Sequence, residues 1–367
     1  MLFHSSLRKE LSRSFGATLV VLVTIVMTMM LIRTLGLASK GSVDPAEVFL
    51  VMTYTVLGYM PTVLSLSLFI AIVGTLSRMY TDSEMVIWFS SGRGLSDFVN
   101  PLFRFAWPIL LLIAMLALVG WPWANSQTQG MREQYERRGD IDRVAPGEFQ
   151  ESSGRNRVFF IDKDTANGTV ASNVFISSIE RNRQIITSAR SGKVESINDT
   201  RYLMLSNGQR LERPLDKTGL KISEFDTYGA RTGSDVPNSA ANAPARARTT
   251  MSLLANPTPI FRAELAWRVG MLFAAINFVL LALAVSSVNP RVGRSGNLLF
   301  ALFAFVVYYN LLNLGQGWVG SGRLGAGAFM LTLHGGVFVL ALLWLAKRHN
   351  NWGRPGRGAA ANRGATA

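Results

Sequence analysis

Six long runs of apolar residues stand out in the pattern of hydrophobic and polar positions along the chain. They cover residues 14–32, 48–77, 105–124, 269–290, 295–322 and 324–346, and none of them contains a charged side chain. A transmembrane helix needs about 20 mostly apolar residues, because the hydrocarbon core of a bilayer is about 30 Å thick and a helix rises 1.5 Å per residue. Buried helices of soluble proteins seldom stay uncharged for so long, so the pattern predicts six membrane spans.

The segment between the third and fourth runs has a different pattern. Short runs rich in β-branched and aromatic residues lie at 157–161, 174–176, 184–187 and 201–205, and turn residues separate them. These runs predict β-strands. The dipeptide Asn207-Gly208 lies between two further runs and predicts a two-residue hairpin turn. Many short strands in about 80 residues favour a β-sandwich or a jelly roll.

Two polar segments connect this β-domain to the apolar runs. Residues 127–138 predict a polar helical extension of the third span. Residues 229–250 are rich in Ala, Ser, Asn, Pro and Arg, a composition that favours a flexible linker.

The predicted fold is therefore a membrane α-helical protein whose six transmembrane helices, arranged as three plus three, flank an inserted β-jellyroll domain. Residues 1–125 hold the first three spans, and 126–260 hold the β-domain with its linker. Residues 261–347 hold the last three spans, and 348–367 form a basic tail.

The basic residues lie beside the apolar runs. Only 16% of the residues are charged, yet the formal net charge is +14. Residues 123–260 hold 19 Lys/Arg and 16 Asp/Glu, so most of the surplus belongs to the membrane segments. Short loops on the side of the two termini carry most of it, whereas the opposite short loops carry only Lys40 and Arg323. This bias predicts cytoplasmic termini and an external β-domain, and it argues against a nucleic-acid partner.

No catalytic or metal-binding pattern is found in the sequence. The chain has no cysteine, which excludes thiol nucleophiles, disulfides and Cys-type metal sites. Its three histidines, His4, His334 and His349, lie far apart. Serine-hydrolase, zinc-protease and Walker A motifs are missing. We therefore predict no catalytic residue, no metal site and no cofactor in this chain.

A glycine-rich motif and a set of carboxylates near the membrane segments do not indicate a functional site. Gly315-Gln-Gly-Trp-Val-Gly320 imitates a dinucleotide fingerprint, but it ends an apolar run, where small residues favour close helix packing. The carboxylates in or beside the membrane segments lie away from mid-membrane, which argues against a secondary transporter with an ion relay. These carboxylates are Asp44, Glu47, Glu84, Asp97 and Glu264.

Arg33 ends the first apolar run on the predicted external side, and Lys40 follows a few residues later. One interpretation, which the residues alone favour, is an interfacial arginine that reaches lipid headgroups. The other is a binding contact for an anionic substrate, because a guanidinium can hold a phosphate with two hydrogen bonds.

The loop at residues 80–92 predicts a short helix at the membrane surface. Asp82 or Ser83 can cap it, and Gly92 can end it. Met85, Val86, Trp88 and Phe89 supply an apolar surface. A helix that rests on lipid is expected to carry Lys or Arg on its polar face. This one carries Asp82 and Glu84, which favours docking into a cytoplasmic protein, with Glu84 offering a charge to it.

Three motifs resemble those of the LptF/LptG permeases, the membrane subunits of an ABC transporter that exports lipopolysaccharide. They are the Ser83-Glu84-Met85…Ser91-Gly92 loop, Ala145-Pro146-Gly147-Glu148-Phe149 before the β-domain, and Ala263-Glu264-Leu265-Ala266-Trp267-Arg268 before the fourth span. The resemblance covers essentially the whole chain. It implies the inner membrane and a periplasmic β-jellyroll. It also implies an LptG-like permease, a dimeric LptB-like ATPase that binds ATP and magnesium, an LptC-like single-span protein and an LptA-like bridge as partners.

The same resemblance assigns roles to single residues. The basic residue at the outer end of the family's first span falls on Arg33, which implies contact with lipopolysaccharide phosphates. Lys40 is the second candidate for this contact. The family's coupling-helix glutamate falls on Glu84, so Ser83, Glu84, Met85 and Trp88 are implied to meet the ATPase. The alternative function is a membrane-anchored periplasmic sensor or scaffold without transport activity.

Overall fold

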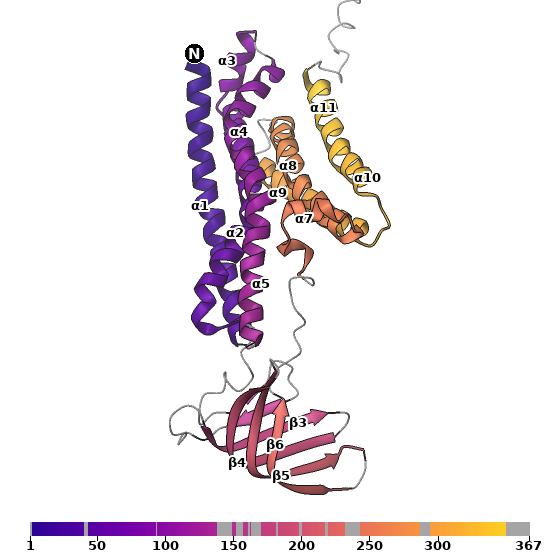
Figure 1. Ribbon diagram of the computed structural model, residues 1–367. Coiled ribbons are helices and arrows are strands. Elements are labelled where there is room, and N and C mark those ends of the chain that lie inside the picture. Colours follow the sequence, from indigo (N-terminus) through magenta and orange to yellow (C-terminus); the bar gives the residue numbers. More distant parts are fainter. Residues whose placement is uncertain are drawn as a thin grey trace, which may run out of the picture. The chain divides into compact units, whose positions relative to one another are not determined.

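The structure is a computed structural model, drawn as a ribbon in Figure 1. It describes residues 2–39, 43–92, 94–137, 149–151, 157–160, 162, 170–180, 183–197, 200–216, 219–231, 243–286 and 294–349. The chain forms two compact units, a helical one built from residues 1–31, 52–127 and 243–367, and a second one built from 32–51 and 128–242.

Six helical segments are long and apolar enough to cross a membrane, which confirms the prediction of six spans. Three of them precede the β-domain in the chain. Their elements are α1 (Leu2–Ser39), η1 (Pro45–Glu47), α2 (Val48–Thr81), η2 (Leu95–Phe98), α4 (Val99–Met115), the π-helical turn η3 (Leu116–Gly120) and α5 (Trp121–Arg137). The short helix α3 (Glu84–Ser90) lies between the second and third spans. Because α5 continues to Arg137, the predicted polar extension of the third span is helical.

The other three spans follow the β-domain in the chain. Their elements are α8 (Pro259–Val285), α9 (Arg294–Gly320), α10 (Ala326–Met330), the π-helical turn η5 (Leu331–Gly335) and α11 (Gly336–His349). Thr258 caps α8 by accepting a hydrogen bond from the Phe261 backbone N–H, and Pro259 occupies the first turn, where its missing N–H costs nothing.

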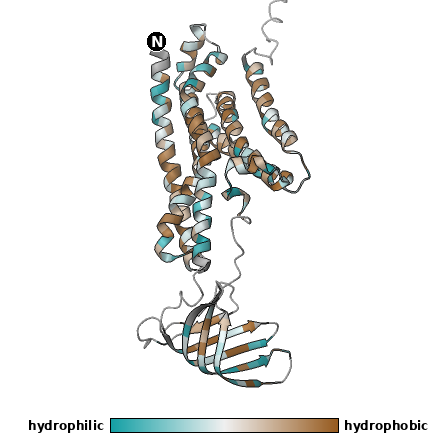
Figure 2. Ribbon diagram, in the orientation of Figure 1, coloured by the Kyte–Doolittle hydropathy of each residue, from teal (hydrophilic) through white to brown (hydrophobic). Residues whose placement is uncertain are grey.

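The most buried span is α8, and it forms the centre of the helical core. The Phe278 ring lies 4.9 Å from the ring of Phe69 on α2 and 4.9 Å from that of Phe305 on α9, measured between centroids. The least buried spans are α1 and α11, and apolar side chains on both remain exposed. Figure 2 colours the apolar residues of the helices brown. Such faces are expected to meet lipid or another membrane subunit.

Six antiparallel strands form the sheet of the inserted β-domain, and each strand pairs with its neighbours in sequence. They are β1 (Phe149–Glu151), β2 (Arg157–Phe160), β3 (Val170–Glu180), β4 (Arg183–Ile197), β5 (Thr200–Pro214) and β6 (Lys221–Arg231). The buried side chains of this domain are Phe159, Val174, Ile176, Ala189, Leu203 and Leu205. An inserted antiparallel β-domain is thus confirmed. Among the described residues its strands run up and down in sequence order, without the crossover connections typical of a complete jelly roll.

The predicted hairpin at Asn207-Gly208 is wrong, because both residues lie inside β5. Ala189 pairs with Gly208 and Ser191 pairs with Ser206, so the strand continues past Asn207 in one register. Asn207 has a positive φ of 53°, and Asn173 on β3 has one of 47°. Asparagine tolerates this left-handed conformation, and one such residue bends a strand without reversing it.

Gly208→Ala is expected to destabilise the β-domain, since a Cβ at Gly208 would lie 2.5 Å from the Ser188 carbonyl oxygen and 2.5 Å from the Phe225 ring. The overpacking should lower the free energy of unfolding by about 1–3 kcal/mol. Limited proteolysis of the β-domain in the full-length protein measures the change. Gly219→Ala is the matched control, because no atom lies within 4 Å of its Cβ position. Equal protease resistance of the two variants would contradict the steric argument.

The prediction of a flexible linker at residues 229–250 is wrong where the structure describes this segment. The strand β6 continues to Arg231, and η4 (Ala245–Ala247) and α7 (Thr250–Ala255) order the other end. Residues 232–242 lie outside the described residues. The composition suggested flexibility, but the Arg268 side chain on α8 donates to the backbone carbonyl oxygens of Ala245, Arg246 and Arg248.

Candidate functional site

The first candidate site lies where α2 ends and α3 begins, and Arg78 is its centre. The Arg78 guanidinium binds both carboxylate oxygens of Glu10 on α1. Its Nη1 also donates to Asp82 at 2.9 Å and to Glu84 at 3.1 Å. A planar guanidinium suits such two-pronged pairing. This Arg78 cluster, formed by Arg78, Glu10, Asp82 and Glu84, therefore ties α3 to α1.

The helix α3 has one buried side and one exposed apolar side. Met85 is 1% exposed and packs into the helical core, so the prediction that it belongs to the exposed surface is wrong. Trp88 is half-buried against the same core. Val86 and Ile87 are 63% and 66% exposed, and Phe89 is exposed as well. The sequence prediction omitted Ile87, although its spacing from Met85 places it on another face of the helix.

The start of α3 is not capped as predicted. Ser83 occupies the N-cap position in a left-handed conformation, with φ of 61°, and its side chain makes no capping hydrogen bond. Asp82 accepts from Arg78 instead. Gly92 follows the helix with φ of 83°, a conformation that suits glycine at a helix end, as predicted. The side chain of Glu84 is 40% exposed, so it stays accessible despite its ion pair with Arg78.

The second candidate site is Arg33, which lies on α1 at the start of the second unit. Its side chain is exposed, and it forms no hydrogen bond or ion pair within the described part of the chain. An unpaired, exposed guanidinium is available to an anion. Lys40 lies outside the described residues.

Sequence reasoning missed a buried polar network among α8, α9 and η5. The Asn277 side-chain amide donates to the Tyr308 hydroxyl at 2.8 Å and to the His334 carbonyl oxygen at 2.9 Å. The Tyr308 hydroxyl also lies 2.7 Å from His334 Nδ1. An apolar cavity of about 540 Å³ adjoins Asn277 and His334. Polar residues inside the apolar runs were the available signal.

The sequence prediction that no ionisable residue lies near mid-membrane overlooked His334. His334 is buried within the last span, and Glu264 and Arg268 are buried on α8. Each has polar partners inside the protein, which lowers the cost of its burial. Within the residues that the structure describes, no group of three His, Cys, Asp or Glu side chains could hold a metal ion.

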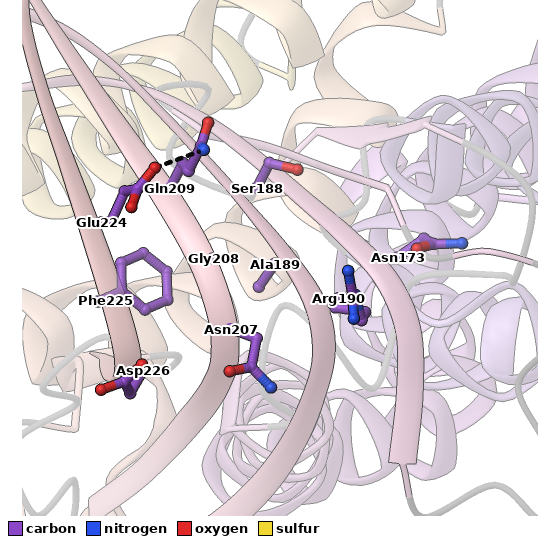
Figure 3. A pocket seen from close by; sticks show the side chains of 10 residues that line it. All are labelled: Asn173, Ser188, Ala189, Arg190, Asn207, Gly208, Gln209, Glu224, Phe225 and Asp226. Atoms are coloured by element: carbon purple, nitrogen blue, oxygen red, sulfur yellow. Dashed lines mark hydrogen bonds between the residues drawn. The ribbon is translucent and has the colours of Figure 1, made fainter.

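The β-domain carries a mostly polar pocket of about 730 Å³ along the line where β3 and β5 bend (Figure 3). Asn173, Arg190, Asn207 and Asp226 line it from four neighbouring strands, and Gln209 donates to Glu224 at 3.0 Å. This lining does not suit a lipid chain. The apolar side chains of the β-domain core, which surround Leu203 and Leu205, suit one better.

Comparison with known proteins matches nearly the whole chain to one protein family. Residues 6–348 match the family described as lipopolysaccharide export system permease LptF/LptG. The chain is 25% identical to the lipopolysaccharide export system permease protein LptF of Escherichia coli K12 and to that of Shigella flexneri, over 94% of this chain and 94% of each relative. Within the resemblance, Asn173–Ile176 and Pro146-Gly147-Glu148-Phe149 favour LptF over LptG. The names of these relatives agree with that prediction.

Proposed function

Because this chain belongs to the LptF/LptG family of lipopolysaccharide export permeases, we propose that it extracts lipopolysaccharide from the inner membrane and passes it to a periplasmic β-jellyroll bridge. The single observation that carries the mechanism is α3, a short helix with an exposed apolar face that the Arg78 cluster ties to α1. No nucleotide-binding motif occurs in the sequence. The energy therefore has to arrive from another subunit.

The exposed face of α3 supplies the contact for that subunit. Val86, Ile87 and Phe89 are large apolar residues on a helix of only seven residues, and burial of their surface against a partner stabilises a complex. Glu84 stands beside them with an accessible carboxylate. The proposed partner is an LptB-like ATPase dimer, which binds the ATP and magnesium. Ser83, Glu84 and Trp88 lie at or beside the proposed ATPase contact, and the buried Met85 anchors α3 to the helical core.

The chemistry of lipopolysaccharide fits the exposed parts of the helices. Exposure of its acyl chains to water costs about 0.8 kcal/mol per CH₂ group, so the transport path has to remain apolar. Exposed apolar side chains on α1 supply such a surface, and Arg33 follows them on the same helix. We infer that Arg33 binds a phosphate of the lipid, assisted by Lys40.

The β-domain fits the next step of the path. Its core is apolar and can receive acyl chains between the bent strands. β1 and β6 are the edges of the described sheet, and a free edge can add a strand from another chain. We propose that an LptC-like single-span protein and an LptA-like bridge continue the sheet, and that an LptG-like permease completes the membrane cavity. Termini in the cytoplasm and the β-domain in the periplasm complete this arrangement.

The proposed function is tested by depletion of the chain from its cells and by its purification in mild detergent. We expect lipopolysaccharide to stop reaching the cell surface, and we expect an ATPase to copurify. A membrane-anchored sensor or scaffold predicts neither result. Continued export after complete depletion would overturn the proposal.

Arg33→Glu is expected to weaken lipopolysaccharide crosslinking to α1 by roughly tenfold, since a carboxylate repels the phosphate that a guanidinium attracts. A photoreactive residue next to position 33 in the purified complex measures the yield. Arg323→Glu is the matched control, because Arg323 is also exposed on the predicted external side. Equal crosslinking of both variants would exclude the phosphate contact but leave the transport function intact.

A further inference from the structure

A buried ion pair on α8 joins the start of α5, the helix that leads toward the β-domain, to the segment through which the chain returns. Arg268 is 0% exposed and Glu264 is 5% exposed. The Nε of Arg268 donates to Glu264 Oε1 at 3.0 Å. The two residues are four positions apart on one helix, so they face the same side.

Arg268 holds the returning chain through its other nitrogens. Nη1 donates to the Thr250 hydroxyl at 2.9 Å, at the first residue of α7. Nη2 lies 3.3 Å from the carbonyl oxygens of Ala245 and Arg246 and 3.0 Å from that of Arg248. These contacts attach to α8 the backbone of a segment whose composition favours flexibility.

Glu264 holds the start of α5, the helix that leads toward the β-domain. Its Oε1 also accepts from Trp121 Nε1 at 2.9 Å, at the first residue of α5. The Thr250 hydroxyl donates to the Leu118 carbonyl oxygen in the π-helical turn η3. Gln316 on α9 donates to Glu264 Oε2 at 3.1 Å. The ion pair therefore links the third span, the returning segment, α8 and α9 in one network.

Helix packing alone does not require this network. Apolar residues of similar volume usually pack a core as well as a buried ion pair does, and often better. A buried pair can instead favour one register, because a displacement that separates the partners leaves a buried charge without partners. In this chain the network joins α8 to the start of α5 and to residues 245–250, which precede and follow the inserted β-domain in sequence.

We propose that Glu264 and Arg268 are positioning residues that latch both connections of the β-domain to the helices, so that lipid can pass from the helices into the β-domain. The inference rests on the proposed transport function. Neither residue needs to touch the lipid. Their removal should leave lipid loading and ATP hydrolysis in place while transfer to the β-domain fails.

The test uses the full complex with its ATPase in liposomes and follows lipopolysaccharide crosslinking at two places. One photoreactive residue is placed on α1 next to Arg33, and the other replaces Leu205 in the β-domain core. Arg268→Lys keeps the charge but cannot present the planar fork that meets Glu264, Thr250 and the backbone carbonyls. We expect unchanged crosslinking on α1, unchanged ATP hydrolysis and a roughly tenfold loss of ATP-dependent crosslinking at position 205.

Two further variants separate a latch from a general folding defect. Arg246→Ala is the matched control, because Arg246 contributes only its carbonyl oxygen and its side chain is exposed. Because the chain has no cysteine, L118C/T250C can be joined by a short bifunctional reagent at the site of the Thr250–Leu118 hydrogen bond. In the Arg268→Lys background, this crosslink should restore transfer to position 205.

Two outcomes would contradict the latch, and a third would contradict the transport function on which it rests. Normal transfer in both Arg268→Lys and Glu264→Gln would overturn the proposal. Equal loss of crosslinking at both places, without rescue by the L118C/T250C crosslink, would also overturn it, because a general folding defect gives that result. If the unmodified complex shows no ATP-dependent lipid crosslinking at either place, the proposed transport function fails instead.

Discussion

Glu84→Lys is expected to uncouple ATP hydrolysis from lipopolysaccharide export. Glu84 lies 3.1 Å from Arg78, so a lysine there would face a guanidinium of the same charge and would push α3 away from the Arg78 cluster. It would also reverse the charge that α3 presents to the ATPase. Mismatched charges at an interface cost several kcal/mol, so export per ATP hydrolysed should fall by tenfold or more.

The measurement compares ATP hydrolysis with lipopolysaccharide release in liposomes that contain the full complex. Asp82→Asn is the matched control, since Asp82 also pairs with Arg78 but belongs to the loop before α3 and is 48% exposed. An exposed pair of this kind contributes about 0–1 kcal/mol, so its loss should be nearly silent. Normal export by the Glu84→Lys variant would refute the coupling role of α3.

A third variant separates the two effects of Glu84→Lys. Glu10→Gln weakens the tie between Arg78 and α1 but leaves Glu84 and the exposed face of α3 unchanged. If movement of α3 has to reach α1 through the Arg78 cluster, this variant also loses export. If Glu84 acts only on the ATPase, Glu10→Gln exports normally.

The membrane architecture could be predicted from the sequence because the signal is long and uninterrupted. An uncharged run of about 20 residues has few stable environments other than a membrane, so six such runs predict six spans regardless of how they pack. The short helix α3 was also predictable, because turn residues and a glycine delimit it.

The errors share a different cause, which is tertiary context. Asn207 favours a left-handed conformation in any sequence, but whether the chain reverses there depends on the strands beside it. Met85 points inward because the adjacent helical core has room for it. Residues 245–250 are held in part by Arg268, which lies about 20 positions away in sequence. Contacts between distant residues leave no local pattern, and propensity alone cannot supply them.

Gly315→Ala is expected to disrupt the packing of α9 against α10. A Cβ at Gly315 would overlap the ring of Phe329, which is buried among Trp267, Met271 and Leu312. The glycine thus permits close helix approach, as its place at the end of an apolar run predicts. The buried ring would have to shift and repack its neighbours, so the substitution should lower the free energy of unfolding by about 1–3 kcal/mol. Thermal denaturation in detergent measures the loss.

Gly317→Ala provides the control on the same helix, because no atom lies within 4 Å of its Cβ position. It should denature at the wild-type temperature or slightly above it, because alanine favours a helix more than glycine does. A double-mutant cycle with Phe329→Ala then tests the cause, since removal of the ring makes room for the added methyl group. The double variant should be less destabilised than the sum of the single variants. Strict additivity, or equal losses at positions 315 and 317, would show that the Phe329 contact does not explain the loss, because helix propensity alone favours alanine over glycine.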